Sequence, residues 1–192
     1  MTSKLVYGVG INDGKYRTSL NNKHSKEYNL WIAMIGRCYS ETYLKECQTY
    51  RDCKVSDNFL NYTYFHEWCQ TQVGFGKQGW HLDKDLLSKS DKIYSEDTCA
   101  FVPNQINTFL ADCSKARGVW PIGVYFHKKS GKFVARYRVE GKKKHLGLFK
   151  TPQEAFIVYK GHKEALCRDL ALQWENEIDT RVFNAMMSWS VN

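Results

Sequence analysis

Apolar and polar residues alternate most regularly in the stretch between residues 123 and 150. Three runs there have a period of two, which is typical of strands that bury one face: residues 124–127, 133–139 and 145–149. The pairs Ser130-Gly131 and Glu140-Gly141 separate the runs, and both suit tight hairpin turns. The pattern therefore predicts a three-stranded antiparallel sheet.

A helix is predicted directly after the third strand. Thr151 suits the N-cap, Pro152 suits the first helical position, and Glu154 completes a capping box. Further residues recur at helical spacing and would form one face: Ala155, Tyr159, His162, Leu166 and Leu170. We expect this face of the helix to pack on the sheet.

The chain before residue 118 shows shorter patterns. Residues 5–20 predict a hairpin that turns at Asn12-Asp13-Gly14, and helical spacing predicts helices over residues 27–39 and from residue 56 or 57 to residue 70. Two strands over residues 81–87 and 99–102, followed by a helix that starts at Pro103, give the order ββα. A last helix is predicted over residues 179–188.

The formal net charge of +8 is concentrated in one segment. Residues 115–150 contain eleven Lys or Arg and one acid, whereas residues 1–114 have a net charge of 0 and residues 151–192 a net charge of −2. A solvated basic face is the ordinary explanation of a charge run, but a segregated basic patch is the electrostatic footprint of nucleic-acid binding. The segment is also the predicted sheet, so the sheet is the candidate binding surface.

Residues two apart on a strand share a face, which groups Arg136 with Arg138 and His127 with Lys129. Arginine can read guanine in the major groove of DNA. Lys142, Lys143 and Lys144 are expected in the second hairpin, where they would contact phosphates rather than base edges.

The motifs Gly-Val-Tyr-Phe, Gly-Lys-Phe-Val-Ala-Arg-Tyr-Arg and His-Leu-Gly-Leu-Phe-Lys-Thr-Pro-Gln-Glu-Ala, from residue 123 to about residue 165, resemble the ethylene-response-factor DNA-binding domain of plants. That domain also forms the C-terminal module of phage and bacterial homing endonucleases. The resemblance implies that five side chains point into a groove of double-stranded DNA: Tyr125, His127, Arg136, Arg138 and His145. His145 stands where the plant family has a tryptophan in the third strand, so the base preference does not carry over.

The motifs Leu-Asp-Lys-Asp-Leu, Tyr-Ser, Cys-Ala-Phe-Val-Pro and Ile-Asn, with Trp31, Met34 and Arg37-Cys38-Tyr39 before them, resemble the HNH segment of phage-encoded endonucleases over residues 7–110. The resemblance implies that His81 is the general base and that Asn107 is the helical ligand of one metal ion. Asp83 and Asp85 supply oxygen donors suited to that ion, which is expected to be Mg²⁺ or Mn²⁺.

Two positions of the HNH motif differ in this chain. Trp80 stands where the family has a metal-binding residue, and Thr98 stands where it has an asparagine that holds the histidine loop. The leading hypothesis is a site-specific DNA endonuclease of the phage homing type. These two departures favour the alternative, a catalytically inactive DNA-binding regulator or inhibitor derived from such a nuclease.

The composition argues against a zinc protein, a membrane protein and a secreted protein. The seven cysteines form no Cys-x-x-Cys pair, and the spacing of Cys38, Cys47 and Cys53 matches no common zinc knuckle, so zinc is not expected. No run of about eighteen apolar residues is present, and the N-terminus lacks the apolar core of a signal peptide. We expect a protein of the cytosol, that of an infected bacterial host if the resemblance holds, with no membrane partner and no small-molecule cofactor.

Pattern, charge and resemblance together predict the α+β class with two domains. Residues 1–117 would form an HNH-like ββα nuclease domain. Residues 118–192 would form the three-stranded antiparallel sheet packed on one helix, with a helical tail. Double-stranded DNA is the expected partner and structured RNA the open alternative. The oligomeric state and the target sequence stay open.

Overall fold

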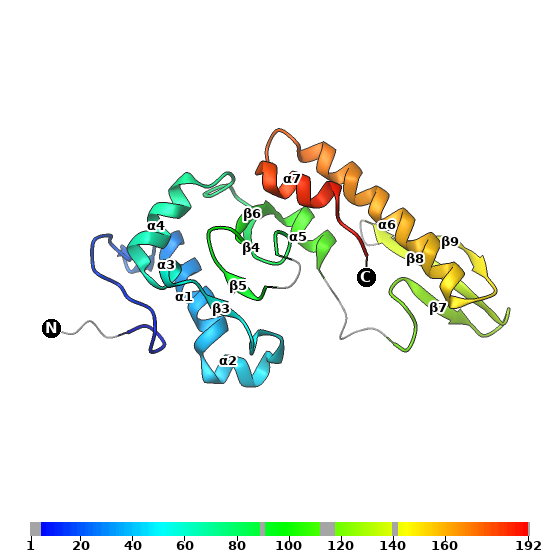
Figure 1. Cartoon of the computed structure of the whole chain (residues 1–192), viewed down its shortest axis with the longest axis horizontal. Coiled ribbons are helices and arrows are strands. Elements are labelled where there is room, and N and C mark those ends of the chain that lie inside the picture. Colours follow the sequence, from blue (N-terminus) through cyan, green and yellow to red (C-terminus); the bar gives the residue numbers. More distant parts are fainter. Residues whose placement is uncertain (1–4, 89–90, 112–117, 140–141, 192) are drawn as a thin grey trace. The chain divides into compact units, whose positions relative to one another are not determined.

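The computed structural model describes residues 5–88, 91–111, 118–139 and 142–191 (Figure 1). The chain divides into two compact units, the first formed by residues 1–108 and 176–185 and the second by residues 109–175 and 186–192. The fold is mixed α and β and contains a three-stranded antiparallel sheet. Among the described residues, no helix combines the length and the apolar character needed to cross a bilayer.

Short helices dominate the first unit. They are α1 (Lys26–Tyr39), α2 (Glu41–Glu46), η1 (Gln48–Tyr50), α3 (Asp57–Leu60), α4 (Tyr62–Thr71), α5 (Asn104–Leu110) and the tail helix α7 (Thr180–Met187). Side-chain oxygens cap four of them by accepting a backbone N–H of the first turn, namely those of Ser25, Ser40, Ser56 and Asn61. The predictions of α1 and α7 are confirmed to within two residues at each end.

The strands of the first unit form two-stranded pairs. β1 (Ser19–Leu20) pairs antiparallel with β2 (Lys23–His24), and β4 (Trp80–Asp83) pairs antiparallel with β6 (Ala100–Pro103). β3 (Lys54–Val55) pairs parallel with β5 (Ile93–Tyr94). These ladders are too short to stabilise a sheet by themselves, so the side-chain core must hold the unit together.

That core is aromatic. Trp31, Phe59, Tyr62 and Phe65 are each fully buried, and the Trp31 indole N–H donates to the Phe59 carbonyl at 2.8 Å. The Phe59 and Phe65 rings meet edge to face, with centroids 5.1 Å apart. Rings of this size bury large apolar areas, which allows a unit of short elements to be stable.

Two predicted elements of the first unit are wrong. The hairpin expected over residues 5–20 is absent, because Val6 exchanges backbone hydrogen bonds with Gly10 and not with the second predicted strand. The hairpin β1–β2 follows instead. The helix expected from residue 56 or 57 to residue 70 is broken at Asn61. Ile11 exchanges backbone hydrogen bonds there, donating to Leu60 and accepting from Tyr62.

The tail also differs from the predicted division, which placed residues 118–192 in one domain. Residues 176–185 belong to the first unit. Arg181 explains this assignment, because its guanidinium donates to the carbonyls of Glu96 at 2.9 Å and Cys99 at 3.5 Å. Asp179 holds the guanidinium in place with an ion pair of 2.8 Å. The predicted boundary after residue 117 falls beside residues 112–117, which lie outside the described residues.

The second unit is regular. Strands β7 (Val124–His127), β8 (Lys132–Val139) and β9 (Lys142–Phe149) form an antiparallel sheet in the order β7-β8-β9, and α6 (Pro152–Trp174) contacts all three. Thr151 and Glu154 form both halves of the predicted capping box. The predicted sheet and helix are therefore confirmed.

One strand boundary of the sheet was predicted wrongly. β9 begins at Lys142 and not at residue 145, because Lys142, Lys143 and Lys144 continue the ladder opposite β8 within the second hairpin. The predicted turn at Glu140-Gly141 lies outside the described residues.

Candidate nucleic-acid interface

The strand register separates two faces of the β7–β9 sheet. Val124, Phe133, Ala135 and Tyr137 pack toward α6, where the Tyr137 ring lies 4.4 Å from that of His162. Neighbouring residues on a strand point to opposite faces, so the residues between them face away from the helix. We call that side the open face. It carries Tyr125, His127, Lys132, Val134, Arg136, Arg138, Lys143, His145 and Leu148.

A β-bulge decides which residues of β9 reach the open face. Ala135 pairs with Gly147, but the next residue of β8, Arg136, pairs with His145. Leu146 is thus the extra residue of the bulge, and its side chain packs toward α6. The bulge brings His145 onto the same face as Arg136.

The register therefore places all five predicted groove-facing residues on one side of the sheet: Tyr125, His127, Arg136, Arg138 and His145. Lys132, Val134 and Leu148 share this face and were not predicted. The signal for two of them was present, because Lys132 and Val134 lie at even spacing from Arg136 on the same strand.

The centre of the open face is apolar and ordered. Val134 is only 1% exposed although it faces away from the helix, and Leu148 beside it is 46% exposed. The Arg136 guanidinium lies 4.0 Å from the centroid of the Tyr125 ring, a cation–π contact. This contact holds Arg136 across the sheet, so less side-chain entropy is lost when it binds a partner.

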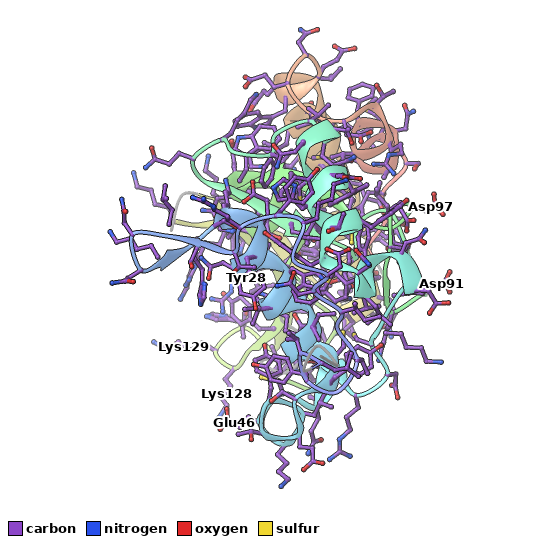
Figure 2. All side chains as sticks on the ribbon, turned by 90° about the vertical axis from the view of Figure 1, so that its left-hand side faces the viewer. Tyr28, Glu46, Asp91, Asp97, Lys128 and Lys129 are labelled. Carbon is purple, nitrogen blue, oxygen red and sulfur yellow. The ribbon has the colours of Figure 1, made fainter. Side chains whose placement is uncertain are left out.

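The β7–β8 turn lies at one end of the open face. His127 Nδ1 lies 2.8 Å from Ser130 Oγ, and the His127 carbonyl accepts the N–H groups of Ser130 and Gly131. β7 ends at His127, so Lys129 lies in the turn and does not share a strand face with His127 as predicted. Lys128 and Lys129 are exposed and extend away from the ribbon (Figure 2).

The three consecutive lysines at the start of β9 do not act as one group. Lys143 pairs with Arg138 and shares the open face, whereas Lys142 and Lys144 pair with Val139 and Tyr137 on the other side of the strand. All three side chains are exposed. Lys142 and Lys144 therefore lie on the side of the strand that is opposite to the open face.

The predicted nuclease residues lie on the β4–β6 pair and α5. Leu82 and Phe101 are paired and both face the aromatic core of the first unit. His81 and Asp83 alternate to the opposite face, where His81 is exposed and Asp83 is half-buried. Asn107 lies in α5, half-buried beside the buried Ile106. β4 pairs with β6, and β6 leads directly into this helix, but the short strand β5 lies between β4 and β6 in the chain.

The carboxylates of this region have other partners. β4 ends at Asp83, not at residue 87 as predicted, because the Asp83 carboxylate turns the chain by accepting the N–H groups of Asp85 at 3.1 Å and Leu86 at 2.9 Å. Burial raises the pKa of Asp83 above its ordinary value. Asp85 lies in the turn, off the strand face of His81, and forms an ion pair with Lys84.

These partners bear on the predicted metal ligands, Asp83, Asp85 and Asn107. Within the described part of the chain, no group of three or more His, Cys, Asp or Glu residues is arranged to hold a metal ion. One oxygen of Asp83 is occupied by two backbone donors and Asp85 faces an ammonium group. Asp83 and Asp85 thus have partners within the protein, and no reaction step through a metal is derived from this arrangement.

The two departures from the HNH motif have structural roles. Thr98 Oγ1 donates to the Ile93 carbonyl at 2.6 Å and accepts from the Ser95 N–H at 3.0 Å, so Thr98 holds the connection between β5 and β6. The Trp80 ring covers Gly74, where an added Cβ would lie 2.1 Å from it, and the Lys77 ammonium is 4.7 Å from its centroid.

Two of the cysteines considered for zinc, Cys38 and Cys53, interact electrostatically with a buried lysine. Lys84 is 6% exposed, and its positive charge acts on the buried thiols of Cys38 and Cys53. Burial nevertheless raises the pKa of Cys38 to about 12, so this thiol is protonated at neutral pH.

Fold and surface together describe a mixed α and β chain with a basic face on a helix-backed antiparallel sheet. No protein-family model, curated protein or solved structure matches the chain. Its function has to be argued from its own residues.

Proposed function

We propose that the chain binds double-stranded DNA through the open face of the β7–β9 sheet, which enters the major groove. The observation that carries the proposal is the register, which aligns Tyr125, Arg136, Arg138 and His145 on the side of the sheet that α6 leaves uncovered. Arginine side chains recognise guanine edges and the other side chains can donate to or accept from bases.

The dimensions of the sheet suit that groove. Three strands spaced about 4.8 Å apart are about 10 Å across between the outer backbones. The major groove of B-DNA is about 12 Å wide. A helix-backed sheet of this width can lie in the groove with its open face toward the bases.

The remaining cations are placed for the DNA backbone. Lys128 and Lys129 extend from the turn at one end of the open face, and Lys132 and Lys143 are exposed on the face itself. Contacts of this kind position a protein on the duplex without reading its sequence. They also make the affinity depend on salt, with a slope of about 0.9 for each phosphate contact.

The test compares arginine variants on a duplex selected by the wild-type protein from a random library. Arg136→Ala and Arg138→Ala should each lose about 1–3 kcal/mol on this duplex and much less on random DNA. Arg168→Ala is the matched control, because it removes an exposed cation of the same unit from α6. Equal losses for all three variants, or no duplex binding by the wild type, would refute the proposal, and stronger binding of structured RNA would favour that ligand.

A second candidate function, hydrolytic cleavage of DNA, is favoured by one observation. The exposed His81 lies on a strand whose partner, β6, leads into the helix that carries Asn107. In such a reaction His81 would accept the proton of a water molecule that attacks the phosphorus, while the bond from phosphorus to the 3′-oxygen breaks and that oxygen leaves, to be protonated from solvent. Wild-type protein would then cut DNA with Mg²⁺ or Mn²⁺, and His81→Ala would bind DNA with unchanged affinity but not cut it. Binding without cleavage by the wild type would leave a DNA-binding regulator or inhibitor.

A further inference from the structure

The β1–β2 hairpin projects from the first unit and has no part in its core. Every residue of the hairpin from Ser19 to His24 is exposed, and the blue ribbon at the left of Figure 2 shows it standing away from the rest of the unit. Asn21 and Asn22 form its two-residue turn with φ values of 51° and 60°. Two positive φ values are the geometry of the tight turn that matches the twist of a hairpin, and asparagine tolerates them.

The base of the hairpin is attached firmly to α1. The Ser25 N–H donates to the Thr18 carbonyl at 2.9 Å, and the Ser25 side chain caps α1. The His24 ring packs edge-on against Tyr28 at 5.1 Å, and the His24 carbonyl accepts from the Asn29 amide at 3.4 Å. The hairpin is thus a small projection on a fixed base.

The hairpin combines an exposed leucine with basic side chains and has no acidic residue near it in sequence. Leu20 is 68% exposed, and it shares a face with Lys23 because the two are paired. No acidic residue occurs between residues 14 and 26, although residues 1–114 as a whole have a net charge of 0. Within the described part of the chain, neither Arg17 nor Lys23 has an ion pair or a side-chain hydrogen bond.

We propose that the β1–β2 hairpin is a second DNA contact that enters the minor groove. This inference rests on the proposed binding of duplex DNA. Leu20 would wedge against a base step, the Asn21 and Asn22 amides would meet the acceptors on the groove floor, and Arg17 and Lys23 would contact the flanking phosphates. Apolar wedges combined with asparagine and basic side chains are the usual means by which proteins bind this groove.

The side chains of the tip favour the minor groove over the major groove. The major groove admits a whole two-stranded ribbon, whereas this tip presents one exposed leucine beside two asparagines at a two-residue turn. Proteins that bind the minor groove insert such an apolar side chain between base steps and use asparagine amides beside it. The degenerate pattern of the minor groove also requires only a few amides to read it.

The test uses the full chain and the duplex selected by the wild-type protein. A set of these duplexes carries 2-aminopurine, which fluoresces more strongly when it is unstacked, at successive positions outside the footprint of the β7–β9 sheet. We expect wild-type protein to raise the fluorescence at one base step and Leu20→Ala to abolish the rise. Leu172→Ala is the control, since it truncates another exposed leucine, 53% exposed, on α6.

A second pair of variants tests the polar contacts. Arg17→Gln/Lys23→Gln should flatten the salt slope of binding by about 0.9 for each phosphate that is no longer neutralised, whereas Lys45→Gln on α2 should not. The double variant Asn21→Gly/Asn22→Gly keeps the tight turn but lacks both amides. It should weaken the contact with the affected base step and leave the rest of the DNA binding unchanged.

The outcomes separate this inference from the proposed function. If the Arg136→Ala loss is observed but the hairpin variants match wild type in fluorescence and salt slope, the hairpin proposal is wrong and the sheet proposal stands. If wild-type protein binds no duplex, both fail. If Leu20→Ala instead converts a dimer into a monomer in sedimentation experiments, the hairpin binds a second copy of the chain and not DNA.

Discussion

The two units of this chain are stabilised in different ways, and the difference decides where charge is left available. In the first unit, several bases form ion pairs with acids of the same unit, as in the pairs Lys15–Glu67 at 2.6 Å and Lys92–Asp52 at 3.2 Å. In the second unit, a regular sheet and a capped helix supply the stability. Glu154, one of the acids of this unit, accepts hydrogen bonds in the helix cap and does not reach the open face. Among the described residues, Lys132, Arg138 and Lys143 of the open face form no ion pair, so their charges are available to a polyanion.

The two candidate sites differ in the same way, in whether their polar side chains already have partners. The open face consists of side chains that project from regular strands, where Arg136 rests on a ring and His127 lies beside a hydroxyl. In the β4–β6 region, the carboxylates that would be ligands already hold a turn or an ion pair. A binding surface needs free groups, and this is why the sheet supports a function more strongly than the β4–β6 region does.

The largest expected effect is a loss of stability of the first unit. Trp31→Ala should destabilise this unit by about 3–5 kcal/mol, because it removes a fully buried ring and leaves the Phe59 carbonyl without its donor. Hydrogen exchange should show weaker protection in residues 26–71 and retained protection in β7–β9. Trp120→Ala, which truncates a ring that is 38% exposed, is the control. Equal loss of protection throughout would mean that the chain unfolds as one cooperative structure.

The next largest effect is a loss of stability of the second unit when a single glycine is replaced. Gly123 has φ +76°, and an added Cβ would lie 2.1 Å from the Tyr159 ring. Gly123→Ala should lose about 1–2 kcal/mol from the backbone conformation and a further ~1–3 kcal/mol from the clash. Gly131→Ala is the matched control, because Gly131 has φ +64° and open space around it. Urea unfolding of both variants measures the clash as their difference, and identical losses would show that Tyr159 moves aside.

A smaller effect concerns the helix that backs the sheet. Thr151→Ala removes the side chain that accepts the Glu154 N–H at 3.2 Å and should destabilise the second unit by about 1 kcal/mol. Thr151→Ser keeps the hydroxyl and should restore most of the stability in thermal unfolding. A loss of the same size in both variants would place the effect in the threonine methyl group and not in the cap.

The smallest effect tests whether Asp83 is structural. Because burial raises its folded pKa above the ordinary value of 3.8, the stability it contributes is fully present below about pH 3.8 and is lost as the pH rises through the folded pKa. Asp83→Asn keeps an acceptor for the two backbone donors but cannot ionise, so it should be more stable than wild type at neutral pH and flatten the profile in that window. Asp85→Asn, at an exposed carboxylate, is the control. If urea unfolding gives the two proteins parallel pH profiles, Asp83 titrates alike when folded and unfolded.

Local patterns predicted the second unit better than the first. The strand alternation and the capping box at Thr151 and Glu154 depend on neighbours in sequence, so the sequence shows them directly. The break at Asn61 depends on Ile11, which is fifty residues away in the chain. No local pattern shows such a bond, and the predicted helix was consequently too long.

The candidate site shows the same limit. Alternation correctly grouped Arg136 with Arg138, but it could not show that β4 ends where Asp83 accepts two backbone N–H groups. Asp83 followed by a second aspartate two residues on fits strand alternation, although aspartate is also a common turn residue. The competing turn separated Asp85 from His81.

The bulge at Leu146 has a consequence for how this protein could diverge. Because β-strand residues alternate between the two faces of a sheet, the one extra residue reverses the face that each residue before it in β9 occupies. Lys143 and His145 consequently face outward, whereas Lys142 and Lys144 do not. If the same residues formed a regular ladder without the bulge, Leu146 would pair with Arg136, and Lys142 and Lys144 would face outward in place of Lys143 and His145, with no change in the charge of the chain. A relative with the same basic composition could thus present a different pair of side chains to its target, and a comparison of such chains by charge alone would not detect the change.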